Sequence, residues 1–289
     1  MAGKVDPHDP RQLTDFKLLS FDVRTLHRTP PLLSRLPEPL KSHTLNSRAS
    51  TLQTFQTHEH HLQKTHPTLP YPSILHLAYL SFAQSLPLTP PPDPSALESE
   101  AQEFSQKIPN WPAFPDTVSA LQKLHKHYKL VILSNINEES IEGTIRNNID
   151  VGWDAVYTAQ RIGSYKPDLR NFEFLIEHVV EDLGSRRRRF CTQRRVSFPF
   201  LSCWTAIGRE GFGEYFNGTN ATDNANLGLR ADHVPVKKMN MTGVWIDRGN
   251  EGQDYEKLKD EVVYAWKFST LGEMADAVEE AFEAQGKKV

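Results

Sequence analysis

Short apolar runs alternate with amphipathic stretches along most of the chain. Residues 16–21 form a run of strand length that ends at Asp22, and residues 128–133 (YKLVIL) are typical of a buried strand. Elsewhere apolar residues recur every three or four positions, as on one face of a helix. The pattern predicts further strands at 155–158, 243–247 and 262–268, and helices at 51–65, 73–85, 95–105, 138–147, 168–180 and 271–284.

The order of these elements predicts an α/β fold with a Rossmann-like parallel sheet. Strands that alternate with helices pair in parallel and are covered on both faces. One strand comes first, then a long stretch rich in Pro, His, Ser and Thr with helical patches, and then the rest of the sheet. We therefore expect a core domain of residues 13–26 plus 112–289, with an inserted helical cap domain at residues 27–111.

Residues 185–228 interrupt this alternation. The segment opens with SRRRRFCTQRR, which contains six arginines, and then becomes rich in Gly and Asn. Such a basic run is compatible with a nuclear signal or an RNA-binding patch, but a solvated loop is the more common case and is favoured here. A stretch that is not native coding sequence is a third interpretation.

The same segment offers little apolar surface to offset an ordering cost of ~1–2 kcal/mol per residue. We therefore expect residues 185–228 to be a disordered insertion within the core, which would leave the sheet without a central strand. The competing hypothesis is that residues 198–207 (FPFLSCWTAI) fill that strand position.

Composition and charge narrow the function classes. The 289 residues include 38% hydrophobic ones, and 33 Lys and Arg against 36 Asp and Glu give a net charge of −3. This balance argues against a protein that coats nucleic acid or an anionic membrane. Two cysteines, Cys191 and Cys203, exclude a disulfide scaffold. With no signal-like N-terminus and no long apolar window, a cytoplasmic location is expected, and a homodimer is left open.

Polar residues follow the predicted strands at the edge where a parallel sheet binds its ligands. Asp22 ends the first strand, and Ser134 and Asn135 end the second. A hydroxyl and backbone N–H groups at a strand-to-helix turn suit an anionic oxygen, although plain helix capping by Ser134 or Asn137 is at least as common. Asp22 alone is more often a turn or cap residue.

Two further charged residues occur in loops later in the chain. Lys166 lies in a tight Lys-Pro loop, Ser164 to Asp168, directly before a helix, where a lysine is either a surface residue or a fixed positive charge over the site. Asp232 comes shortly before the predicted strand 243–247.

Taken in order, these motifs resemble the haloacid dehalogenase superfamily. The segments LSFDV (19–23), WPAFPD (111–116), LSN (133–135), SYKPD (164–168) and VWIDR (244–248) are most similar to its type II L-2-haloacid dehalogenase branch, in particular the fungal members. Residues 55–82 resemble the helical cap of that branch. The resemblance covers about residues 13–23, 31–184 and 229–284.

The resemblance implies a hydrolase that turns an (S)-2-haloacid into a 2-hydroxy acid. Asp22 would be the nucleophile that displaces the halide and forms an aspartyl ester, which water then cleaves. Lys166 would keep Asp22 ionised, since an opposite charge nearby favours the carboxylate. Asp232 would position Lys166 or the hydrolytic water. The substrate, a small-molecule carboxylate, would be bound by Ser134, Asn135 and Thr25. No cofactor and no essential metal are expected.

Several positions depart from the family pattern. Arg24 stands where the phosphatases of the superfamily carry a second Asp, which disfavours a Mg²⁺-dependent phosphatase, the first alternative. After Asp22 the chain is either one residue short, with Thr25 as the family's threonine, or lacks the loop altogether, and then Thr25 has no counterpart. Phe172 replaces a tyrosine, and the substrate-binding arginine of the bacterial cap is not evident. A catalytically impaired relic is therefore the second alternative.

Overall fold

A six-stranded sheet forms the centre of the protein in the computed structural model, which describes residues 11–23, 26, 48–86, 91, 93–184, 200–204, 229–248 and 258–286. All neighbouring strands pair in parallel, in the order β3-β2-β1-β4-β5-β6. The strands are β1 (Leu18–Phe21), β2 (Lys129–Ser134), β3 (Ala155–Thr158), β4 (Phe200–Trp204), β5 (Thr242–Ile246) and β6 (Trp266–Phe268).

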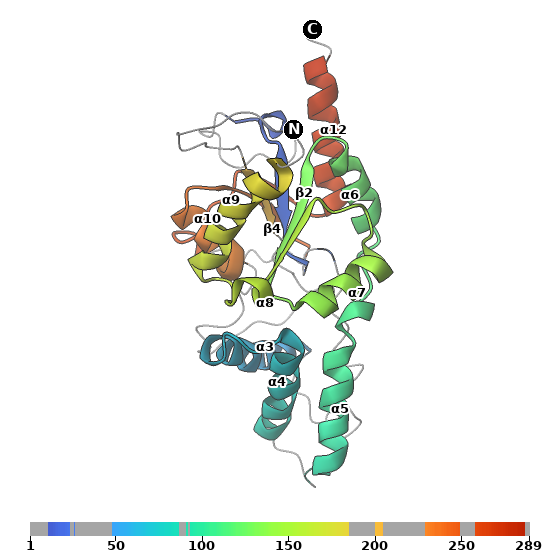
Figure 1. Cartoon of the computed structure of the whole chain (residues 1–289), viewed down its shortest axis with the longest axis vertical. Helices are drawn as coiled ribbons and strands as arrows, with labels where there is room; N and C mark the ends of the chain where they lie inside the picture. Colours follow the sequence, from blue (N-terminus) through green and yellow to red (C-terminus); the bar gives the residue numbers. More distant parts are fainter. Residues whose placement is uncertain are drawn as a thin grey trace.

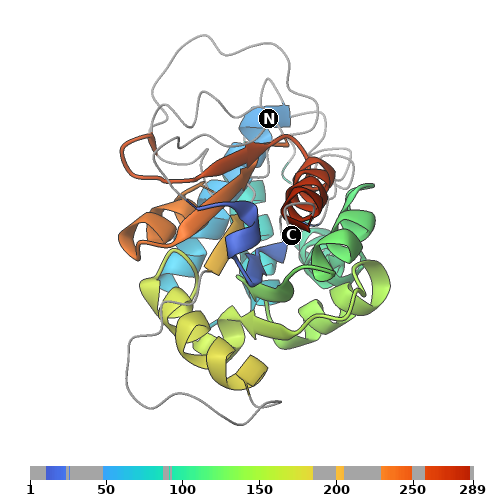
Figure 2. The same cartoon turned by 90° about the horizontal axis from the view of Figure 1, so that it is seen from above.

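Helices cover both faces of this sheet, with α6 and α12 on one side and α9 and α10 on the other (Figures 1 and 2). Alternate residues of β2 belong to different cores: Leu130 and Ile132 pack with α6 and α12, whereas Val131 and Leu133 pack with α9 and α10. This explains why the strand is apolar on both faces from Leu130 to Leu133. The helices of the core are α6 (Thr117–His125), α7 (Glu138–Asn148), α8 (Ala159–Ile162), α9 (Leu169–Gly184), α10 (Val234–Lys238) and α12 (Leu271–Gly286), with the short turns η1 (Leu13–Asp15) and η4 (Leu229–His233).

Three further helices occur between β1 and β2 in the chain and lie beyond the carboxyl ends of the strands (Figure 1). They pack around an apolar centre that includes Phe55, Tyr79, Phe82 and Phe104. We call them the helical insertion; they are α3 (Arg48–Thr65), α4 (Tyr71–Ser85) and α5 (Pro94–Gln106), followed by η3 (Ile108–Asn110). The predicted α/β fold with a parallel sheet and helices inserted after its first strand is confirmed.

A close contact joins the end of the insertion to the core. Gly143 on α7 faces Pro109 of η3, and a Cβ atom at Gly143 would lie only 2.6 Å from the Cβ of Pro109. A glycine is therefore required for this approach of the two segments.

The expectation for residues 185–228 is wrong where the structure describes them. Residues Phe200–Trp204 form β4, which pairs with β1 (Leu18 opposite Phe200) and with β5 (Leu201 opposite Thr242). The competing hypothesis of a strand within 198–207 is confirmed for these five residues, and the rest of 185–228 lies outside the described residues. The physical reason is that β1 is buried along its whole length, so its N–H and C=O groups need partners on both sides.

None of the helices in the described ranges combines the length and the apolar character needed to cross a membrane.

Because β4 is internal to the sheet, replacing one of its residues by proline should destabilise the protein far more than replacing it by a small residue that keeps its N–H. We expect Ser202→Pro, which removes a ladder N–H, to cost at least the ~3 kcal/mol that a proline costs inside a helix, and to abolish soluble expression or lower the melting temperature sharply. Ser202→Ala keeps the N–H and is the control. Equal melting temperatures for the two variants would contradict the central place of β4.

Candidate active site

The carboxylate of Asp22 lies at the carboxyl end of the central strand, where it is buried and held by two neighbours. Its Oδ1 accepts a hydrogen bond of 2.8 Å from the Oγ of Ser134, the last residue of β2. The same oxygen lies 3.2 Å from the Nζ of Lys166. Both contacts thus go to Oδ1, and among the described residues Oδ2 has no such contact.

Lys166 carries the buried positive charge of the site. Its Nζ lies 2.7 Å from Oδ1 of Asp232 and 3.2 Å from Oδ1 of Asp22, and it donates a 3.0 Å hydrogen bond to the carbonyl of Leu133. A buried ammonium group is tolerated only when it is paired and hydrogen-bonded. One hydrogen bond and two ion pairs meet that requirement and hold the ammonium group in place.

Asp232 reaches this cluster from η4, the turn that follows β4 in the chain. It is fully buried, and its ion pair with Lys166 supplies the opposite charge that such a carboxylate needs. Asp22, Asp232 and Lys166 together carry a net charge of −1. Like carboxylates repel, and the ammonium group of Lys166 lies within ion-pair distance of both.

The loop that carries Lys166 is held by amide side chains from two elements. Asn135 follows directly after β2. Its Oδ1 accepts a hydrogen bond of 2.7 Å from the N–H of Lys166, and its Nδ2 donates one of 3.1 Å to the carbonyl of Lys166. On the other flank, the buried Asn171 of α9 donates from Nδ2 to the Oγ of Ser164 at 2.9 Å and to the carbonyl of Asp168 at 3.1 Å. The peptide bond between Lys166 and Pro167 is cis.

The structure brings together five of the six residues that the sequence singled out: Asp22, Ser134, Asn135, Lys166 and Asp232. Thr25 lies outside the described residues. The side chains of Ser134 and Asn135, which were expected to bind the substrate carboxylate, are engaged with Asp22 and Lys166.

Sequence reasoning missed the contributions of Leu133, Asn171 and Tyr165. A backbone carbonyl leaves no signal in a sequence. Asn171 did leave one, since it is an asparagine among the apolar positions of α9, where such a residue needs hydrogen-bond partners.

Tyr165 links the helical insertion to the loop of Lys166. Its hydroxyl donates a 2.5 Å hydrogen bond to the carbonyl of Leu69, in the connection between α3 and α4. Burial, and then the nearby charge of Glu59, raise the pKa of Tyr165, so the phenol stays protonated and able to donate. Glu59 is itself buried and accepts hydrogen bonds from Tyr71 (2.9 Å) and Gln63 (3.2 Å).

A second ion pair ties the start of α6 to the end of β5. Arg248 donates two hydrogen bonds to Asp116, of 2.8 and 2.9 Å, and its guanidinium lies 4.0 Å from the ring centre of Phe114. Burial alone would raise the pKa of Asp116, but the bonds from Arg248 and from the N–H of Gly272 outweigh it and hold the pKa below its usual value. These residues come from two of the segments, 111–116 and 244–248, that carried the resemblance.

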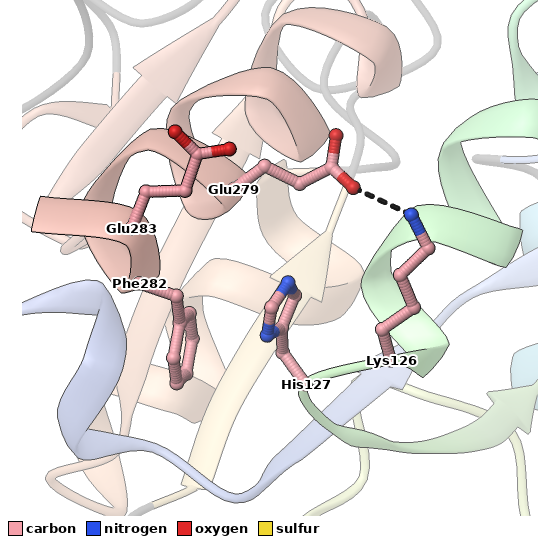
Figure 3. Close-up of a pocket in the computed structure, with 5 residues that line it drawn as sticks. All are labelled: Lys126, His127, Glu279, Phe282 and Glu283. Carbon is pink, nitrogen blue, oxygen red and sulfur yellow. Dashed lines mark hydrogen bonds and ion pairs between the residues drawn. The ribbon is translucent and has the colours of Figure 1, made fainter. Parts of the chain in front are cut away.

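A shallow surface hollow of about 330 Å³ lies elsewhere, between the end of α6 and α12 (Figure 3). His127 stacks on Phe282 there, and Lys126 pairs with Glu279 at 2.8 Å. Residue 127 lies two positions before the start of β2, so this hollow is at the amino ends of the strands, opposite Asp22. Among the described residues, no group of three or more His, Cys, Asp and Glu side chains is arranged to hold a metal ion.

Comparison with solved structures identifies the fold. The L-2-haloacid dehalogenase from Xanthobacter autotrophicus superposes with a TM-score of 0.60 at 16% identity, over 91% of this chain and 98% of that one. The same enzyme with chloropropionic acid covalently bound superposes with a TM-score of 0.59 at 15% identity, with the same coverage of both chains. A HAD-hydrolase named YfnB from Bacillus subtilis, bound to magnesium, superposes with a TM-score of 0.56 at 12% identity, over 91% of this chain and 99% of that one.

The chain therefore has the fold of the haloacid dehalogenase-like (HAD) hydrolases, as its motifs led us to expect. No protein-family model matches the sequence, and no curated protein sequence matches it.

The pair between Asp116 and Arg248 predicts a pH-dependent contribution to stability. A carboxylate whose folded pKa is lowered stabilises the protein above its unfolded pKa of ~3.9 and loses that effect as the pH falls through the folded value. Asp116→Asn should cost about 2 kcal/mol at pH 7, because buried Arg248 loses its charged partner, and this gap from the wild type should close in acid.

The measurement is chemical unfolding of both proteins between pH 7 and pH 3. The control is Asp276→Asn, which breaks an exposed pair with Lys123 and should leave the free energy of unfolding nearly unchanged at every pH. A pH-independent gap for Asp116→Asn would mean that the charge of Asp116 contributes nothing.

Proposed function

We propose that this protein is a HAD-superfamily hydrolase that releases halide from (S)-2-haloacids. The observation that carries the proposal is the buried Asp22 carboxylate, with Oδ1 held by Ser134 and Lys166 while no described side chain holds Oδ2. A nucleophile needs one atom free and the rest of the group fixed in direction. The structural relative from X. autotrophicus, which has chloropropionic acid covalently bound, supports the same chemistry by analogy.

In the first step, Oδ2 of Asp22 attacks C2 of the haloacid from the side opposite the halogen. The new C–O bond forms as the halide leaves with the bonding electron pair, which gives an ester of the Asp22 side chain. Lys166 and Ser134 hold the carboxylate in a fixed orientation through Oδ1 before the attack.

In the second step, water attacks the carbonyl carbon of that ester. Oδ1 becomes the oxygen on which negative charge develops, and the donors that already contact it, Ser134 Oγ and Lys166 Nζ, are placed to stabilise this charge. Cleavage regenerates Asp22 and releases the 2-hydroxy acid. The net reaction consumes one water and yields halide and one proton. Asp232 keeps Lys166 in place, at 2.7 Å.

The helical insertion acts as the cap in this proposal. It lies beyond the carboxyl ends of the strands, on the side of Asp22, and Tyr165 connects it to the loop of Lys166 (Figure 1). A cover of this kind excludes bulk water, which strengthens the electrostatic contacts of the site. We retain residues 27–111 as its extent and 13–26 plus 112–289 as the core.

A Mg²⁺-dependent phosphatase is the alternative, favoured by the HAD-hydrolase relative bound to magnesium. Against it stands Arg24, since a guanidinium cannot give up its proton and so cannot serve as the acid and base of phosphoryl transfer. The departures from the family pattern near Asp22 leave a catalytically impaired relic as a further alternative. Assays of halide release and of phosphate release distinguish the dehalogenase, the phosphatase and the relic.

The purified protein should release halide from (S)-2-chloropropionate with EDTA present. It should not hydrolyse p-nitrophenyl phosphate with Mg²⁺. Asp22→Asn should abolish halide release, because the neutral amide is no nucleophile, whereas Asp150→Asn at an exposed site should leave it unchanged. Phosphatase activity alone would overturn the proposal, and silence of folded protein in both assays would favour the relic.

Isotope labelling tests the ester directly. In a single turnover in water enriched in ¹⁸O, the label should enter the side chain of Asp22, because water attacks the ester at its carbonyl carbon. Mass spectrometry of the peptide that contains Asp22 measures this. Label found only in the hydroxy acid product would mean direct attack of water on C2.

A further inference from the structure

Asn135 makes an unusually complete set of bonds to one other residue. Its side-chain amide pairs with both main-chain groups of Lys166, accepting from the N–H at 2.7 Å and donating to the carbonyl at 3.1 Å. This is the pairing that one strand makes with its neighbour, made here by a side chain. The amide of Asn135 therefore presents both its acceptor and a donor to Lys166.

The position of the Lys166 main chain determines where its ammonium group lies. The Nζ atom must reach three oxygen atoms at once, those of Asp22, Asp232 and Leu133, at distances between 2.7 and 3.2 Å. A shift of the Cα atom by an ångström would lengthen at least one of these contacts, and displacements of that size are enough to cost about 100-fold in rate.

The other supports of the loop bond to neighbours of Lys166. Asn171 holds Ser164 and Asp168, and Tyr165 bonds to Leu69 of the helical insertion. Asn135 bonds to Lys166 itself, and it follows directly after Ser134, the hydroxyl donor to Asp22. Two successive residues at the end of β2 thus contact the two charged groups: Ser134 bonds to Asp22, and Asn135 bonds to Lys166.

We propose that Asn135 is a positioning residue that fixes Lys166 against Asp22, rather than a ligand of the substrate carboxylate. Its effect on turnover rests on the proposed function. The two roles differ in what they do to the rate constants: a substrate ligand supports binding, whereas a positioning residue supports the step in which Lys166 acts.

The kinetic test is Asn135→Ala, beside Asn147→Ala as a matched control. Asn147 is an exposed asparagine of α7 whose amide bonds to Pro109 and Asn110, away from Asp22. With 2-chloropropionate, we expect Asn135→Ala to lower kcat about tenfold or more while KM stays within about twofold, and Asn147→Ala to change neither. A raised KM with kcat retained would overturn the proposal and restore the role of substrate ligand.

A second measurement needs no turnover, so it stands even if the wild type proves inactive on every haloacid. Acylation of amines is followed by mass spectrometry at Lys166, with the half-exposed Lys123 as an internal reference. Because Lys166 is buried, with one hydrogen bond and two ion pairs at its Nζ, it should react much more slowly than Lys123 in the wild type and in Asn147→Ala. In Asn135→Ala we expect its relative rate to rise about tenfold or more, since the loop is released.

Unchanged acylation of Lys166 in folded Asn135→Ala would overturn the proposal. Should that variant not fold, Asn135→Asp is used instead. It keeps an acceptor for the N–H of Lys166 but sets an oxygen against the carbonyl that Nδ2 now contacts. We expect the same rise in acylation for Asn135→Asp, and protection equal to the wild type would again refute the role.

Discussion

One buried ammonium group, that of Lys166, holds the site together. It lies between two carboxylates that are far apart in the sequence, Asp22 and Asp232, and it also donates a hydrogen bond to the carbonyl of Leu133. Without it, two like charges would face each other away from water, at a cost of several kcal/mol. Folding must therefore deliver the ends of β1 and β2, the loop before α9 and the turn η4 to one place.

The sheet meets this demand through its strand order. In the order β3-β2-β1-β4-β5-β6, Asp22 directly follows β1, the strand that lies between β2 and β4. Parallel pairing puts all carboxyl ends at the same edge, so residues directly after β1 and β2 are neighbours without any further device. Polar contacts then refine the placement: Ser134 reaches Asp22 across the edge, and Asn135 reaches back to the loop of Lys166.

Much of this was predictable from the sequence because it depends on local pattern. Strand-length apolar runs that end at Asp22 and at Ser134 predict both the elements and the edge, and the Lys-Pro loop marks the start of a helix. The partners of polar side chains were not predictable in the same way. Whether Asn135 bonds to a substrate or to Lys166 depends on where a loop 31 residues later returns, and no periodicity records that.

β4 is the clearest case of tertiary context prevailing over composition. Its flanks are rich in Arg on one side and in Gly and Asn on the other, which argued for an excursion, yet five residues, Phe200–Trp204, complete the sheet. The need comes from β1, whose buried backbone requires two neighbours. The short apolar run Phe200–Trp204 was enough to form the neighbouring strand, although the segments on either side of it are polar in composition.

The same context explains how a long connection is compatible with an assembled site. Residues 205–228 separate β4 from η4, and still Asp232 lies 2.7 Å from Lys166. Leu229 and Val236, on either side of Asp232, pack into two separate apolar clusters, and the ion pair with Lys166 adds a third contact. The position of Asp232 is thus set by the contacts on both sides of it.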